Sequence, residues 1–148
     1  LHQFFILFML SLFKPYTNPQ KYINFENMQD SVKNGKFIII NTLHSHEQSC
    51  LIKNTVFAHD EERIINEMLF SFNTPDKPVI IYGKNDTDVQ VDEKYNKLVK
   101  IGVEQVYIYK GGLFEWMLLQ DIYGEDEFPT TSKQIDILLY RPLKSMHL

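Results

Sequence analysis

The chain has 148 residues, of which 44% are apolar and 23% charged, and its formal net charge is −4. This length suits one domain with a core of its own, and an acidic balance without any basic run gives no reason to expect a nucleic-acid partner. The only cysteine, Cys50, excludes an internal disulfide and every Cys-x-x-Cys motif, and it favours a reducing, intracellular location.

The first segment is strongly apolar. Residues 4–13, "FFILFMLSLF", contain no polar side chain except Ser11, yet they are short of the roughly 20 residues that span a bilayer. A basic leader and a small-residue cleavage site, which mark a signal peptide, are absent. We expect residues 1–19 to stand apart from a domain over residues 20–148. A helix packed on the domain or on a second copy is favoured; membrane association through residues 1–14 and a targeting remnant remain alternatives.

The next stretch predicts three strands and a helix. Residues 21–25 suit a short strand, and residues 26–35 a helix that ends at a glycine. Residues 36–43 include a fully apolar run from 37 to 40, which is typical of a strand buried on both faces. After a polar stretch, residues 55–58 suit a short edge strand.

Residues 59–102 predict a helix, a strand and a second helix. Residues 59–72 have helical spacing, with His59 or Asp60 as the expected cap. Their apolar positions are Ile64, Ile65, Met68, Leu69 and Phe72. Residues 79–82, "VIIY", suit a buried strand, and residues 89–102 a helix that ends at a glycine.

The last part begins with a strand over residues 103–109 and a turn at 110–112. Residues 113–124 predict a further helix, and residues 125–132 a solvated acidic loop. Residues 132–140 suit a short helix capped by Ser132.

Strands that alternate with helices predict an α/β fold. We expect a parallel sheet of about five strands with helices on both faces. Sites in such sheets lie at the carboxyl ends of the strands. The expected rim therefore comprises Asn41–His46, Gly83–Asp88 and Lys110–Gly112.

Residues 77–116 resemble the second half of a rhodanese-like domain. They show a buried strand, a six-residue loop, a helix that ends in "KIG" and the strand "VYIY", in that order. A Gly-Gly pair follows, with a tryptophan four residues later: Gly111, Gly112 and Trp116. The likeness extends over roughly Tyr22 to Asp121, more loosely in its first half.

The resemblance implies a mechanism and also indicates its loss. In the family, a cysteine at the first loop position carries a persulfide, or a phosphate in related phosphatases, and backbone N–H groups with a loop arginine hold the anion. Here Gly83 stands at the cysteine position and Asp88 at the arginine position. We therefore expect no catalytic residue in a vestigial active-site loop that consists of Gly83, Lys84, Asn85, Asp86, Thr87 and Asp88.

Residues 44–50, "HSHEQSC", hold several side chains of metal-ligand type. These are His44, His46, Glu47 and Cys50. Their spacing matches no zinc motif, and a further ligand would have to come from Asp86 or Asp88. We favour solvated histidines and a partly buried thiol, and we expect neither a metal nor a cofactor.

The predicted function is that of a catalytically inactive rhodanese-like domain, which acts as a binding or structural module for an unidentified protein partner. One alternative is an active sulfurtransferase or phosphatase with Cys50 as a non-standard nucleophile. Another is a membrane-anchored domain. A homo-oligomer is compatible with all three.

Overall fold

The structure is a computed structural model that describes residues 19–73 and 75–145. The apolar segment expected at residues 4–13 therefore lies outside the described residues. The strands are β1 (Tyr22–Ile23), β2 (Ile38–Asn41), β3 (Val79–Tyr82) and β4 (Val106–Tyr109). The α-helices are α2 (Phe25–Asn34), α3 (Ala58–Phe70), α4 (Val89–Ile101) and α5 (Gly112–Tyr123). Two 3₁₀ helices are η1 (Ser45–Glu47) and η2 (Ile137–Tyr140).

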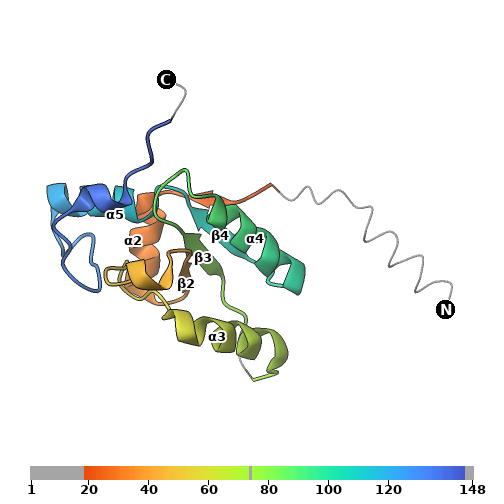
Figure 1. Ribbon diagram of the computed structural model, residues 1–148. Coiled ribbons are helices and arrows are strands. Elements are labelled where there is room, and N and C mark those ends of the chain that lie inside the picture. Colours follow the sequence, from red (N-terminus) through yellow and green to blue (C-terminus); the bar gives the residue numbers. More distant parts are fainter. Residues whose placement is uncertain (1–18, 74, 146–148) are drawn as a thin grey trace, which may run out of the picture.

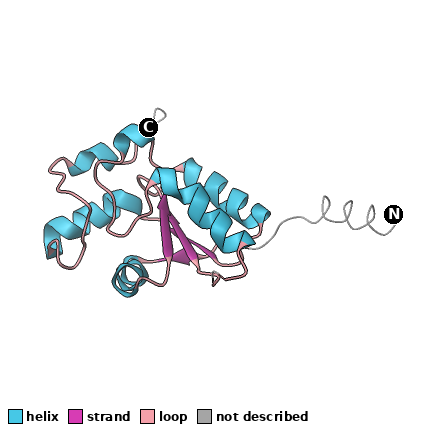
Figure 2. Ribbon diagram, turned by 90° about the horizontal axis from the view of Figure 1, so that it is seen from below, coloured by secondary structure: helices cyan, strands magenta, loops and turns pink. Residues whose placement is uncertain are grey.

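The described strands form one parallel sheet in the order β1-β4-β3-β2. Strands β2 and β3 are buried along their whole length, as expected for continuous β-branched runs in a sheet covered on both faces. Figure 1 shows the sheet in the middle of the molecule, and Figure 2 shows helices on both sides of its strands. The expected α/β architecture is confirmed.

Two apolar clusters hold the helices against the sheet. On one face, α2, α5 and the residues after α5 pack around Trp116, which is fully buried. On the other face, α3 and α4 pack through Ile65, Met68 and Leu98. Each fully buried aliphatic side chain contributes about 1.5–3 kcal/mol relative to an exposed one, so both layers are needed for a stable sheet.

The described sheet has four strands rather than about five. Residues 55–58 contribute only a single parallel bridge between Thr55 and Ile39, because α3 already begins at Ala58. The expected cap of α3 is wrong as well: Phe57 occupies that position and makes no side-chain capping hydrogen bond. Because the helix follows so soon, these residues are too few to form a further strand of the sheet.

The C-terminal extension, which we define as residues 124–145, is part of the fold. The backbone N–H of Thr131 donates to the Leu51 carbonyl, and the indole N–H of Trp116 donates to the Pro129 carbonyl at 3.1 Å. Ser132 does not cap a helix; its hydroxyl donates to the Ser49 carbonyl, and the short helix starts later, at Ile137. The extension therefore covers the α2–α5 face as a further layer of the domain.

Among residues 19–73 and 75–145, no helix combines the length and the apolar character that a membrane crossing requires.

Candidate functional site

The strand register brings three loops to one edge of the sheet. Asn41 pairs with Tyr82, and Tyr82 pairs with Tyr109, so β2, β3 and β4 end side by side. The segments that follow them begin at the same level. The predicted rim is therefore formed, and the loop over residues 83–88 lies at its centre, between the other two.

The amino-terminal end of α5 holds this loop in place. The backbone N–H of Leu113 donates to the Gly83 carbonyl, and that of Phe114 to the Lys84 carbonyl, both at 2.9 Å. Two of the helix N–H groups that lack a partner within the helix are thus satisfied by the loop. Gly112 permits this approach: its φ is +67°, and a Cβ there would lie 2.6 Å from the Gly83 oxygen.

The carboxylate of Asp88 turns back into the loop. Its Oδ2 accepts from the Lys84 backbone N–H at 3.1 Å and from the Thr42 hydroxyl at 3.0 Å. Its Oδ1 accepts from the Gln90 N–H at 3.0 Å and so caps α4. Backbone donors that face the inside of such a loop are the groups that bind an anion, and here an internal carboxylate accepts from one of them, the Lys84 N–H.

The same carboxylate occupies the space beside Gly83. A Cβ on Gly83 would lie 2.4 Å from Asp88 Oδ2 and 2.7 Å from Val91 Cγ2. Real Cβ atoms do not tolerate such distances, so any larger residue at position 83 requires Asp88 to move. Glycine and aspartate at these two positions are therefore sterically matched.

Asn85 ties the loop to the C-terminal extension. Its side chain is buried; the amide N–H donates to the Tyr140 carbonyl at 3.0 Å. Its Oδ1 accepts from the backbone N–H of Thr87 at 3.0 Å and from the Thr87 hydroxyl at 2.7 Å. The buried amide of Asn85 therefore bonds both to the loop itself and to the extension, and it fixes the loop from a second side.

Lys84 and Asp86 are the charged side chains of the loop that reach outward. The Lys84 ammonium contacts Glu47 Oε1 at 2.6 Å, and this hydrogen bond lowers the pKa of Glu47. Asp86 is exposed. The cation nearest to Gly83 is therefore already paired with a carboxylate, which reduces its attraction for an anion.

The end of β2 does not supply a charged pair. Asn41 is buried, and its Oδ1 accepts from the Leu43 N–H at 3.0 Å. Leu43 packs into the apolar cluster beneath α2 and α5. The end of this strand is thus held by an internal hydrogen bond and by apolar packing.

The Gly-Gly-x-x-x-Trp segment forms the start of α5, with Gly111 at the N-cap position. Trp116 packs edge-on against Tyr109 and Phe128. The hydroxyl of Tyr109 donates to Glu115 Oε1 at 2.8 Å, and burial together with this carboxylate raises the pKa of Tyr109. Gly111 lies beneath the Glu115 carboxylate, where a Cβ would be 2.4 Å from its carbon. These residues shape the helix start that holds the loop.

Cys50 is buried away from solvent, with 1% of its surface exposed. Its Sγ lies 3.3 Å from the Ser132 carbonyl and 4.0 Å from the Met117 sulfur. The thiol thus sits in the apolar layer beneath the extension, more deeply than the partly buried position expected from the sequence.

His44 and His46 lie on the surface, with their rings stacked and the centroids 5.7 Å apart. His44 is the N-cap of η1, and His46 lies within this 3₁₀ helix. The structure does not bring them together with Cys50, and nowhere in the described part of the chain do three or more histidine, cysteine or carboxylate side chains gather to hold a metal.

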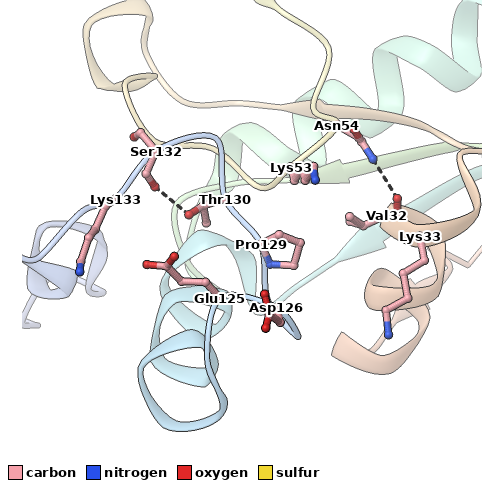
Figure 3. A pocket seen from close by; sticks show the side chains of 10 residues that line it. All are labelled: Val32, Lys33, Lys53, Asn54, Glu125, Asp126, Pro129, Thr130, Ser132 and Lys133. Atoms are coloured by element: carbon pink, nitrogen blue, oxygen red, sulfur yellow. Dashed lines mark hydrogen bonds between the residues drawn. The ribbon is translucent and has the colours of Figure 1, made fainter.

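Two hollows lie near these elements. One, of about 800 Å³, runs between α3 and α4 and opens at Asn41, Thr42 and His44. The other, of about 670 Å³, lies between the end of α2, the turn at residues 53–54 and the extension. Figure 3 shows Lys33 and Lys133 on opposite sides of this second hollow, with the carboxylates of Glu125 and Asp126 between them. No residue of the loop over 83–88 lines either hollow, although the first hollow borders the rim at Asn41, Thr42 and His44.

Sequence reasoning missed two residues that organise the loop. Asp88 immediately precedes a helical pattern, and this position alone predicts an N-cap. The hydrogen bond from Asn85 to Tyr140 joins residues 55 positions apart, and no local sequence pattern predicts it.

Comparisons with known proteins agree with the fold described above. The sequence profile of the rhodanese-like domain family matches residues 25–119. The structure is similar to the single-domain sulfurtransferase RDL2 of Saccharomyces cerevisiae, with a TM-score of 0.53 and 18% identity over 72% of this chain and 96% of that one. It is also similar to the Alr3790 protein of Anabaena sp., with a TM-score of 0.51 and 21% identity over 79% of this chain and 84% of that one. For the BH2092 protein of Bacillus halodurans, the TM-score is 0.53 and the identity 16%, over 79% and 80% of the two chains. A comparison with curated proteins finds no match.

Proposed function

This chain belongs to the rhodanese-like domain family, and we propose that it is a member without sulfurtransferase activity, which serves as a binding or structural module. The observation that carries the proposal is the contact between Gly83 and Asp88. The position from which a nucleophile would project has no side chain, and the Asp88 carboxylate fills the adjoining space. A carboxylate held in place by the Lys84 N–H and the Thr42 hydroxyl also repels a thiolate or a substrate anion.

The burial of Cys50 supports the same proposal. A persulfide is passed on only from a sulfur that a second molecule can reach, whereas 1% of Cys50 is exposed. Its near neighbours are a carbonyl oxygen and a thioether, and neither activates a thiol as a nearby cation would. The active-enzyme alternative through Cys50 therefore has little chemical support.

We expect the full chain to show no thiosulfate:cyanide sulfurtransferase turnover and no phosphatase turnover above the buffer rate. An active rhodanese serves as the positive control, and the variant Cys50→Ser as the matched negative control. Turnover in the parent that disappears in Cys50→Ser would refute the proposal in favour of the enzyme.

A second experiment tests the loop itself. In Gly83→Cys the retained Asp88 carboxylate crowds the new thiol and disfavours its ionised form, so we expect a thiol pKa at or above the usual value of about 8.5. In Gly83→Cys with Asp88→Arg, the opened loop and the new cation should lower the thiol pKa by roughly one unit or more. Identical thiol pKa values in the two variants, measured by alkylation rate against pH with Cys50→Ser in both, would contradict the role given to Asp88.

A protein partner and an intracellular location follow from this proposal and stay predictions. Co-purification from cells with the full chain, compared with a chain that lacks residues 1–14, tests both the partner and the membrane-anchored alternative. Recovery in the membrane fraction that depends on residues 1–14 would favour the anchor.

A further inference from the structure

The outer side of α5 and the C-terminal extension carry large apolar side chains that nothing in the described residues covers. Their exposed fractions run from 41% at Leu118 to 88% at Leu143. They are Leu118 and Ile122 on α5, and Ile135, Leu138, Leu139 and Leu143 on the extension. We call these six residues the C-terminal apolar surface.

The two parts of this surface are neighbours. Helices α5 and η2 pack side by side, and Figure 1 shows the blue C-terminal segment beside α5 at one end of the molecule. Leu118 and Ile122 are four residues apart and so lie on one side of α5, whereas the buried Leu113, Trp116 and Met117 face the core. A helix that is apolar on both sides is expected to be buried on both.

The size of the surface lies at the upper end of what an isolated protein usually exposes. At on the order of 100 Å² for each such side chain, the six together expose on the order of 600 Å², the upper end for the largest patch on a monomer. Interfaces are roughly 60% apolar, so a centre of this size corresponds to a footprint of about 1,000 Å² per partner, which is enough for a stable dimer.

The charges beside the two parts have opposite signs. Residues 112–123 carry two carboxylates, at Glu115 and Asp121, and no basic residue. Residues 133–145 carry three basic residues, at Lys133, Arg141 and Lys144, against one carboxylate. In a two-fold symmetric contact each patch meets its counterpart reciprocally, so the acidic α5 of one copy can lie over the basic residues 133–145 of the other.

We propose that the C-terminal apolar surface is a homodimer interface, occupied by the same surface of a second copy with α5 set against the partner's extension. The interface lies next to the loop through the bond from Asn85 to the Tyr140 carbonyl. It goes beyond the proposed loss of activity and does not depend on it, since an active enzyme could assemble in the same way.

The test is the mass of the full chain by sedimentation over about 1–100 µM. We expect a monomer–dimer equilibrium in the parent, and a dissociation constant at least tenfold higher in Ile122→Asp and in Leu138→Asp. The matched control is Phe72→Asp. It changes a fully exposed apolar side chain that follows α3 and lies outside the C-terminal apolar surface, and it should leave the mass unchanged. Circular dichroism confirms that each variant is folded.

A charge exchange makes the test specific for the arrangement. We expect Asp121→Lys and Lys144→Glu each to weaken the homodimer, because like charges then face each other, and an equimolar mixture of the two variants to recover a dimer. A parent that stays monomeric at 100 µM overturns the proposal, as does a dimer that survives Ile122→Asp. A monomeric parent that binds phosphatidylcholine vesicles, with binding lost in Ile122→Asp, overturns it in favour of a lipid surface.

Discussion

At the scale of single residues, glycines and an aspartate decide what the loop can do. Asp88 caps a helix and accepts from loop donors with the same carboxylate. Gly83 leaves room for that carboxylate, and Gly112 leaves room for the Gly83 carbonyl. Each residue therefore permits the next contact, and a side chain added at either glycine forces a shift that begins in the loop.

Gly112→Ala tests the close approach of α5 to the loop. We expect it to lower the free energy of unfolding by at least about 1 kcal/mol more than Gly35→Ala does. Both glycines have positive φ, +67° and +64°, but a Cβ meets backbone at Gly112 and open space at Gly35. Urea denaturation of both variants measures the difference; equal losses would show that α5 can withdraw from the loop without cost.

The pair of Glu47 and Lys84 predicts a pH-dependent contribution to stability. The hydrogen bond from Lys84 lowers the pKa of Glu47 in the folded protein, so the stabilisation is present above the unfolded pKa of about 4.3 and is lost as the pH falls through the folded value. We expect Glu47→Gln to cost about 0.5 kcal/mol at pH 7 and nothing measurable near pH 2.5.

The matched control for this pair is Glu62→Gln, which changes an exposed carboxylate on α3 and should have no such pH dependence. Chemical denaturation of the three proteins at both pH values makes the comparison. A loss in Glu47→Gln that is equal at the two pH values would mean that the side chain acts through packing rather than charge.

At the scale of elements, the C-terminal extension behaves as a layer of the domain. Phe128 is buried against Trp116, with their ring centroids 5.0 Å apart, and it also meets Phe25 of α2. The backbone of the extension pairs with residues 51 and 53 through Thr131 and Pro129. The family profile ends at residue 119, so the extension lies outside the matched residues although it packs directly on the core.

Phe128→Ala tests that requirement. We expect a loss of about 3–4 kcal/mol in the free energy of unfolding, since the substitution leaves a cavity between α2 and α5. Phe72→Ala, at a fully exposed position, should change the free energy by less than about 0.5 kcal/mol. Similar small effects of both variants in thermal or urea unfolding would mean that the extension is dispensable for the fold.

At the scale of the whole molecule, the two faces of the sheet have different tasks. One face is closed by α3 and α4, with amphipathic helices that bury one side each. The other is closed by α2, α5 and the extension, and it carries both the ties to the loop and the C-terminal apolar surface. The proposed loss of activity and the proposed self-association therefore depend on the same side of the protein, although separate variants distinguish them.

The amino-acid sequence by itself determined the alternation of strands and helices, the rim at the carboxyl ends of the strands, and the glycine at the first position of the loop. These follow from local apolar periodicity and from residue identity, which need no knowledge of the fold. The short strand at residues 55–58 was overestimated, because propensity does not say how early the next helix begins.

Only the tertiary structure decided how the loop is filled and what the extension does. The Asp88 carboxylate reaches Thr42, 46 positions away, and Asn85 reaches Tyr140, 55 positions away. Contacts over such separations depend on how the layers pack, which no local pattern encodes. The same holds for the C-terminal apolar surface: the sequence shows apolar residues in α5 and the extension, but only packing determines which of them remain uncovered.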